Sequence, residues 1–208
     1  MDEARALCES ALECANVFES VGMKDIVIAI KASDTMLNIK ANRLLASTCD
    51  YPLHIGVTEA GTLRTGLVKS AIGIGALLEE GIGDTIRVSL STNVCEEVLA
   101  GKKILQTLGL SKNAVEVVSC PTCARTEIDV EGLANKVEMM TAGIDKPIKI
   151  SILGCPLNGI GEGENSDLGI AGGKEKSVIL LHGKILKTVP SERLMEEFDK
   201  ILQEVLSN

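Results

Sequence analysis

The chain carries two cysteine segments, Cys120-Pro121-Thr122-Cys123 and Gly154-Cys155-Pro156-Leu157-Asn158-Gly159-Ile160-Gly161-Glu162. An apolar run over residues 147–153 leads directly into the second segment and is predicted to be a buried strand. Two thiols separated by two residues can bind one metal centre, and a third thiol at the end of a strand can reach the same centre. We therefore expect this part of the chain to fold around a metal site.

The number of cysteines bears on which metal the site takes. A structural zinc site normally has four protein ligands, whereas a cubane iron-sulfur cluster can be held by three thiolates, with one iron left for a weaker ligand. Glu162 lies seven residues after Cys155 in the same glycine-rich turn, so it is the candidate for the fourth position. A zinc knuckle and three unrelated thiols remain the alternatives.

Composition narrows the class of protein and its partners. The 208 residues are 45% hydrophobic and 24% charged, which fits one large globular domain or two small ones. The chain has no Trp, one Tyr and two Phe, so it lacks the aromatic platforms of proteins that bind single-stranded nucleic acid. A net charge of -8 argues against general binding to nucleic acid or to anionic membranes.

The sequence also gives an expectation about the compartment. No apolar run approaches the roughly 20 residues that a transmembrane helix needs, and the first residues lack a signal-peptide pattern. The seven cysteines form an odd number, which fits a reducing compartment better than a disulfide framework. We expect a soluble, cytoplasmic protein, with the plastid stroma as the alternative.

Strand and helix patterns alternate through the first half of the chain. Helices are predicted at residues 3–21, 35–48, 68–80 and 95–108, and strands at 26–30, 52–57 and 85–90. This order is typical of parallel βαβ units. Lys31, Glu59 and Arg87 with Ser89 would emerge at the strand ends. The first three are spaced at regular intervals of 28 residues, as expected at the carboxyl ends of strands in a TIM-type barrel. Three strands cannot close such a barrel, so the alternatives are the end of a longer barrel, a wall supplied by another chain, or an open sheet.

The pattern breaks near residues 110–114, where we place a domain boundary. The prediction is a partial TIM barrel over residues 1–112 and an α+β domain over 113–208 that carries the cysteines. In the second domain, strands are expected at 115–118 and 147–153, a helix at 129–142, a hairpin at 177–181 and 184–189, and a last helix after Ser191. The fold class is therefore α/β, with the last three βα units of a barrel followed by an α+β module.

Six ordered stretches resemble the C-terminal portion of the 4-hydroxy-3-methylbut-2-enyl diphosphate synthase family of the non-mevalonate isoprenoid pathway. They are residues 30–34 (IKASD), 51–61, 80–90 (EGIGDTIRVSL), 120–123 (CPTC), 154–162 and 169–173 (GIAGG). The resemblance covers essentially the whole chain, and it implies that the first part of the family's TIM barrel lies outside it. Ile160 stands where the family usually has Pro, and Pro156 replaces an aliphatic residue.

The resemblance implies a [4Fe-4S] cluster held by Cys120, Cys123 and Cys155, with Glu162 as the displaceable fourth ligand. A carboxylate on iron among thiolates is the bond most easily exchanged for a substrate oxygen. The implied reaction is the reductive ring opening and dehydration of 2-C-methyl-D-erythritol 2,4-cyclodiphosphate. The cluster would supply the redox chemistry, while the protein supplies positioning and charge.

The resemblance also assigns roles at the strand ends. Lys31, Arg87 and Ser89 would bind the substrate diphosphate through a point charge, a planar fork of donors and a hydroxyl. Glu59 would donate a proton to the leaving hydroxyl, and His54 would make a second polar contact. The alternatives are solvated charges or strand-end caps for the diphosphate contacts, a structural carboxylate for Glu59 and a core histidine for His54.

The family further implies a ferredoxin or flavodoxin as electron donor. It also implies a homodimer in which the cluster domain of one subunit closes the barrel of the other. Two other hypotheses remain. The chain is a non-catalytic cluster-binding or dimerisation fragment that needs a separate N-terminal barrel piece, or it is a simple electron-transfer or zinc-binding module.

Overall fold

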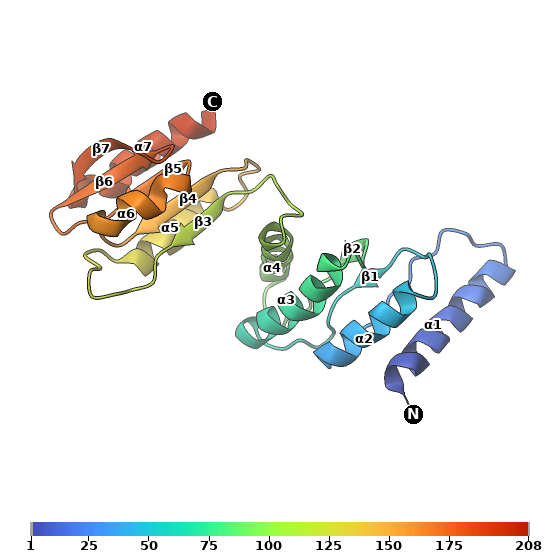
Figure 1. Ribbon diagram of the computed structural model, residues 1–208. Coiled ribbons are helices and arrows are strands. Elements are labelled where there is room, and N and C mark those ends of the chain that lie inside the picture. The colour runs from blue at the N-terminus through green and yellow to red at the C-terminus, as the bar shows by residue number, and fades with distance from the viewer. Residues whose placement is uncertain (1, 208) are drawn as a thin grey trace. The chain divides into compact units, whose positions relative to one another are not determined.

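A computed structural model gives the fold and describes residues 2–207. The chain separates into two compact units, Met1–Ser111 and Lys112–Asn208, so the division falls one residue before the predicted boundary. The elements of the first unit are α1 (Glu3–Ser20), α2 (Thr35–Ala46), β1 (His54–Ile55), α3 (Leu63–Glu79), β2 (Thr85–Ile86) and α4 (Val94–Thr107) (Figure 1). This unit is therefore built from helices that alternate with short extended segments.

Side-chain caps explain where several of these helices begin. The Asp34 carboxylate accepts a hydrogen bond from the backbone N–H of Leu37 at 2.7 Å, which starts α2. Asn93 accepts from Cys95 at 2.9 Å and starts α4 in the same way. Each cap satisfies one of the N–H groups that the first turn of a helix leaves without a partner. Gly81, with φ of +77°, follows α3 in the left-handed conformation that glycine adopts easily.

Three parallel segments carry the residues predicted at the strand ends. β1 and β2 pair in parallel through His54 with Thr85 and Ile55 with Ile86. On the other side of β1, residues 26–30 make only one isolated parallel bridge, between Ile28 and Leu53. The prediction of a strand over 26–30 was therefore wrong, because this apolar run pairs through a single residue. The parallel order of the three segments nevertheless agrees with the expected βαβ pattern.

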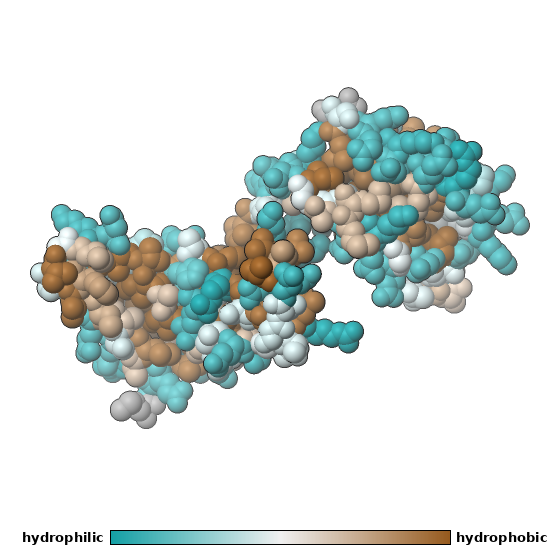
Figure 2. All heavy atoms as spheres, turned by 180° about the vertical axis from the view of Figure 1, so that it is seen from behind, coloured by the Kyte–Doolittle hydropathy of each residue, from teal (hydrophilic) through white to brown (hydrophobic). Residues whose placement is uncertain are grey.

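The core of the first unit lies between these segments and the helices. The largest of its fully buried side chains are aliphatic and come from α2, β1 and α3: Leu45, Ile55, Ile74 and Leu77. Other apolar residues remain exposed near α1, and Figure 2 shows hydrophobic atoms gathered on one face of this unit. A groove of about 370 Å³ lies between α1 and residues 26–31. Exposed Phe18 and Val27 line this groove, with exposed fractions of 49% and 58%.

The second unit contains a five-stranded mixed sheet in the order β3-β4-β5-β6-β7. Its strands are β3 (Glu116–Ser119), β4 (Lys149–Leu153), β5 (Leu168–Ala171), β6 (Lys176–Leu181) and β7 (Lys184–Pro190). β3, β4 and β5 run parallel, and β5, β6 and β7 are antiparallel neighbours. Its helices are α5 (Val130–Thr141), α6 (Pro156–Glu162) and α7 (Leu194–Ser207), with 3-10 turns at Gly163–Asn165 and Ser191–Arg193.

Alternating side chains cover both faces of this sheet. On one face, Ile150, Ile170 and Ile179 pack in one cluster with Val137 of α5 and Phe198 of α7. The residues one position along, such as Ala171 and Leu180, form a second cluster with Ile160 of α6. This alternation follows from the two-residue period of a strand. The sheet is thus covered by α5 and α7 on one face and by α6 on the other.

Two elements of this unit were not expected from the sequence. β5 occupies part of the glycine-rich stretch 169–173, for which no strand was predicted, and α6 occupies the predicted glycine-rich turn. Gly159 permits α6 to approach the sheet, because a Cβ at this position would lie 2.9 Å from the Ala171 Cβ and 3.1 Å from the Leu153 Cβ. The turn prediction for residues 154–162 was therefore wrong, since close packing rather than turn formation accounts for this glycine.

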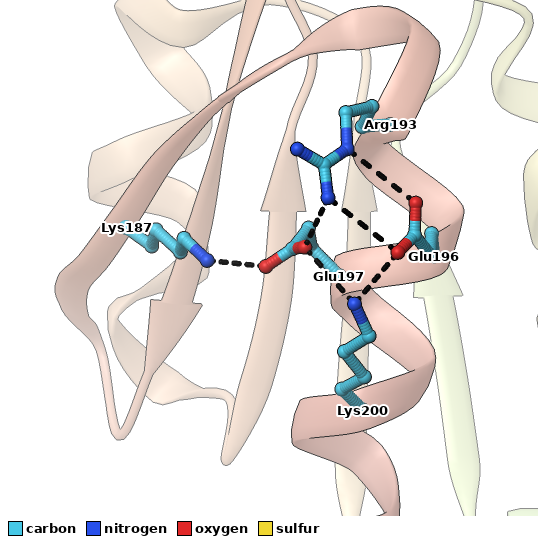
Figure 3. Close-up of polar contacts among 5 residues, drawn as sticks. All are labelled: Lys187, Arg193, Glu196, Glu197 and Lys200. Atoms are coloured by element: carbon cyan, nitrogen blue, oxygen red, sulfur yellow. Dashed lines mark hydrogen bonds and ion pairs between the residues drawn. The ribbon is translucent and has the colours of Figure 1, made fainter.

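A network of ion pairs joins β7 to the start of α7 (Figure 3). The Glu197 carboxylate contacts Lys187 of β7, Arg193 at 3.2 Å and Lys200 at 3.2 Å, and its side chain is only 12% exposed. Glu196 completes the network through Lys200 at 2.7 Å and Arg193 at 3.4 Å. Hydrogen bonds from these cations lower the pKa of both carboxyl groups.

None of the helices in the described residues combines the length and apolar character that crossing a membrane requires.

Candidate functional site

A cluster of basic side chains lies at the carboxyl ends of β1 and β2. The Lys31 ammonium donates a hydrogen bond to the backbone carbonyl of His54 at 3.1 Å. Its side chain crosses Gly56, where a Cβ would lie 3.5 Å from Lys31 Cε and 2.3 Å from the carbonyl oxygen of Arg87. The structure therefore brings three predicted residues, Lys31, His54 and Arg87, to one place. The sequence analysis did not recognise Gly56, although a glycine directly after a strand is a signal of close approach.

Charge and burial shift the titration of this cluster. Burial, with a smaller contribution from the positive charge of Arg87, lowers the pKa of Lys31 to about 8. Burial also lowers the pKa of His54, with smaller contributions from Lys31 and Arg87. His54 Nδ1 lies 2.8 Å from the Thr85 hydroxyl, which orients the imidazole. Because the charged forms of these groups repel one another, an anion bound among them would raise both pKa values.

The loops that follow the three parallel segments are linked through the backbone. Thr58 N–H donates to the carbonyl of Ala32 at 3.2 Å, and Ser91 N–H donates to the carbonyl of Gly61 at 2.9 Å. The first bond holds the loop with Lys31 beside the loop with Glu59. The second holds the loop with Glu59 beside the loop with Ser89. Glu59 is exposed and has φ of +51°, an uncommon backbone conformation for a residue other than glycine. Ser89 is half-buried.

In the second unit, strand pairing brings the two cysteine segments together. β3 and β4 are in register through Ser119 and Ile152, so Cys120 and Gly154 emerge from adjacent strand ends. Cys120 N–H donates to the carbonyl of Ile152 at 3.2 Å. The backbone N–H of Gly154 in turn donates to the Cys120 sulfur at 3.1 Å, and Cys155 follows as a buried residue. The backbone of the second segment thus contacts the first cysteine directly.

Thr126 organises the loop that contains Cys123. Its hydroxyl accepts a hydrogen bond from Cys123 N–H at 2.9 Å and lies 3.7 Å from the Cys123 sulfur. The backbone N–H of Arg125 and the Thr126 hydroxyl lower the pKa of this exposed thiol. The Thr126 side chain also faces Gly154, where a Cβ would lie 3.0 Å from Thr126 Cγ2. Thr126 therefore lies between the two cysteine segments, and the sequence analysis missed it.

The predicted ligands meet only some of the requirements for a metal centre. Glu162 is exposed at the end of α6. Within residues 2–207, no group of three or more His, Cys, Asp or Glu side chains is gathered in a way that would hold a metal ion. The donor types nevertheless fit an iron-sulfur cluster, since three thiols are available and the Cys120 sulfur already accepts an N–H bond from the Cys155 segment. Convergence of all four ligands on one centre stays a prediction.

Together the two units define an α/β chain in which a basic cluster at parallel strand ends precedes a sheet domain that carries three cysteines at its strand ends and loops. Residues 1–102 match the family model of the GcpE TIM-barrel domain, and residues 116–204 match that of the GcpE protein C-terminal domain. The chain belongs to the GcpE family.

Similar proteins of known name are 4-hydroxy-3-methylbut-2-en-1-yl diphosphate synthases (flavodoxin). That of Caldanaerobacter subterraneus subsp. tengcongensis is 52% identical over 201 residues, which cover 97% of this chain and 57% of the relative. That of Clostridium acetobutylicum is 50% identical over 194 residues (93% and 56%), and that of Anoxybacillus flavithermus is 46% identical over 208 residues (98% and 57%). The chain spans about half the length of the curated relatives that it matches.

Proposed function

We propose that this chain contributes the diphosphate-binding strand ends and the cluster domain to a 4-hydroxy-3-methylbut-2-enyl diphosphate synthase. The reaction is the reductive opening of 2-C-methyl-D-erythritol 2,4-cyclodiphosphate to 4-hydroxy-3-methylbut-2-enyl diphosphate. It consumes two electrons and two protons and releases one water. The observation that carries the proposal is the Lys31, His54 and Arg87 cluster at the carboxyl ends of parallel segments in a chain of this family.

Lys31 and Arg87 bind the diphosphate in this proposal. The two cations lie close enough for each charge to be felt by the other, because Arg87 lowers the pKa of Lys31. A diphosphate relieves this repulsion and forms charge-assisted hydrogen bonds with both groups. Ser89 adds a hydroxyl contact, and His54, whose pKa is lowered by burial in the ligand-free chain, adds a polar contact. Glu59, on the adjoining loop, is the proton donor to the hydroxyl that leaves as water.

The [4Fe-4S] cluster would be held by Cys120, Cys123, Cys155 and Glu162. When bound, it would relay to the substrate, one at a time, the two electrons that an external donor provides. The chain's own contribution is to orient the thiols: Gly154 N–H donates to the Cys120 sulfur, and the Thr126 hydroxyl lies beside the Cys123 sulfur. The printed names of the relatives support flavodoxin as the electron donor, and ferredoxin is the alternative. We also propose a homodimer and, because the relatives come from bacteria, a cytoplasmic location.

A second candidate follows from the length of the chain. Since it spans about half of each relative, it would act as a cluster-binding and dimerisation fragment that becomes catalytic only with a separate N-terminal barrel piece. The two candidates differ in one assay. Substrate turnover by the 208-residue chain with a chemical reductant supports the first, whereas turnover that requires an added N-terminal piece supports the second.

Inorganic pyrophosphate tests the anion site without requiring turnover. We expect Lys31→Met and Arg87→Met each to raise the Kd for pyrophosphate about tenfold or more, because each removes a hydrogen bond to a charged group. The matched control is Lys40→Met, which removes an exposed lysine of α2. Equal affinity in Lys31→Met, Arg87→Met and the control would contradict the proposed site.

A further inference from the structure

Two asparagines in α2 are buried within an otherwise apolar core. Asn38 is 0% exposed and Asn42 is 1% exposed, and they lie one helical turn apart beside Ile39, Ala41 and Leu45. A buried amide costs free energy unless its polar atoms find partners, and an aliphatic side chain would fill such a position at less cost. Asn38 Oδ1 and Asn42 Nδ2 have such partners, whereas Asn38 Nδ2 has none among the described residues. The partners that are present indicate what the asparagines do.

Both amides contact the backbone on either side of Lys31. The Asn42 side-chain NH2 donates to the carbonyl of Ile30 at 3.1 Å and to the carbonyl of Asn38 at 2.9 Å. The side-chain oxygen of Asn38 accepts from the N–H of Ala32 at 3.3 Å. The residue before Lys31 is thus bonded through its carbonyl, and the residue after it through its N–H.

These bonds compensate for the lack of a regular strand in this segment. Ile28 pairs with residues 52–54: its N–H donates to the carbonyl of Pro52 at 2.9 Å, and its carbonyl accepts from the N–H of His54 at 2.8 Å. The next backbone bond to the neighbouring segment comes only at Ala32, whose carbonyl accepts from Thr58. Between those points the two amides supply the contacts that a strand would have made.

We propose that Asn38 and Asn42 are positioning residues, which hold the Ile30–Ala32 backbone so that the Lys31 side chain crosses Gly56 and its ammonium reaches the His54 carbonyl. The inference rests on the proposed function, because it names the residues that place a diphosphate-binding cation. The geometry has a measurable consequence. Lys31 is half-buried and faces Arg87 and His54, so a released Lys31 becomes hydrated and its pKa returns toward the ordinary lysine value.

The test follows the titration of Lys31 in the full 208-residue chain. Acetic anhydride labels only the neutral amine, and mass spectrometry of the Lys31 peptide at pH 6 to 11 gives the midpoint. We expect Asn42→Leu to shift this midpoint upward, so that the labelled fraction at pH 8, relative to its high-pH plateau, falls at least tenfold. A complete return to the ordinary lysine value would give roughly a hundredfold fall. Ile39→Val is the control, because it perturbs the same core without removing either amide.

A second measurement covers the case in which Asn42→Leu does not fold. Asn38→Ala removes the acceptor for Ala32 N–H, so hydrogen exchange at the Ala32 amide should be faster than in Ile39→Val, even where the two variants have equal stability. Unchanged labelling in Asn42→Leu, or unchanged Ala32 exchange in Asn38→Ala, would overturn the inference. The proposed function fails separately: a Lys31→Met variant with unaltered pyrophosphate affinity would refute the anion site while leaving the positioning result intact.

Discussion

Gly56→Ala is the most informative single substitution in the first unit. An added Cβ would lie 2.3 Å from the Arg87 carbonyl oxygen and 3.3 Å from its carbonyl carbon. Both are backbone atoms of the residue that follows β2, so they cannot rotate away as the end of a flexible side chain would. Relief requires that the chain after β1 and the chain after β2 move apart by about 1 Å, which strains the Arg87 N–H bond to the Ile55 carbonyl, now 2.9 Å long.

Overpacking of this kind typically costs about 1–3 kcal/mol. We therefore expect Gly56→Ala to lower the free energy of unfolding of the first unit by about that amount and to weaken pyrophosphate binding, since Lys31 Cε lies 3.5 Å from the same Cβ position. Tyr51 is the single tyrosine, and the chain has no tryptophan, so tyrosine fluorescence during urea unfolding reports on the first unit alone.

Gly75→Ala is the matched control. Gly75 lies inside α3, and nothing lies within 4 Å of the position that its Cβ would occupy. Alanine in a helix interior is favoured over glycine by about 0.5–1 kcal/mol, so this variant should be as stable as the unchanged chain or more stable. The reasoning would be refuted if Gly56→Ala had the same unfolding midpoint and slope as the unchanged chain.

Three further predictions concern the second unit. Anaerobic reconstitution should load about four irons per chain, Cys155→Ser should reduce that content strongly, and Cys95→Ser should not; equal iron in the two variants would argue against the proposed ligand set. Because Glu197 has a lowered pKa in the folded state, its contribution to stability is present at neutral pH and is lost as the pH falls through that pKa. Glu197→Gln should therefore lower Tm at pH 7, and its Tm should converge with that of the unchanged chain in acid. Equal Tm differences at both pH values would contradict this. Phe198→Ala should cost about 3–5 kcal/mol by circular dichroism melting, because Phe198 is 0% exposed, whereas Phe18→Ala at a 49% exposed position should cost much less.

The sequence determined where most of the helices lie, because their signals are local; α6 was not expected, and α3 begins five residues before the predicted start. Apolar spacing predicted α2 within two residues of its observed end. Regular spacing of Lys31, Glu59 and Arg87 also predicted that they follow successive parallel segments. The signal for strands was weaker, because an apolar run such as 26–30 shows that a segment is partly buried but does not show how many of its residues pair.

Only the tertiary structure decided how the site residues are held. Gly56 matters because Arg87, distant in sequence, passes over it, and no local pattern encodes that contact. From the sequence alone, Asn38 and Asn42 are polar residues of a helix, which are expected to be exposed. Both are buried, because their side chains bond to the backbone of residues 30 and 32. Contacts between distant segments also explain α6. Its glycines predicted a turn, but they form a helix that packs closely on the sheet. Local sequence specifies backbone preference, whereas contacts between distant segments decide which polar groups are buried and what they bind.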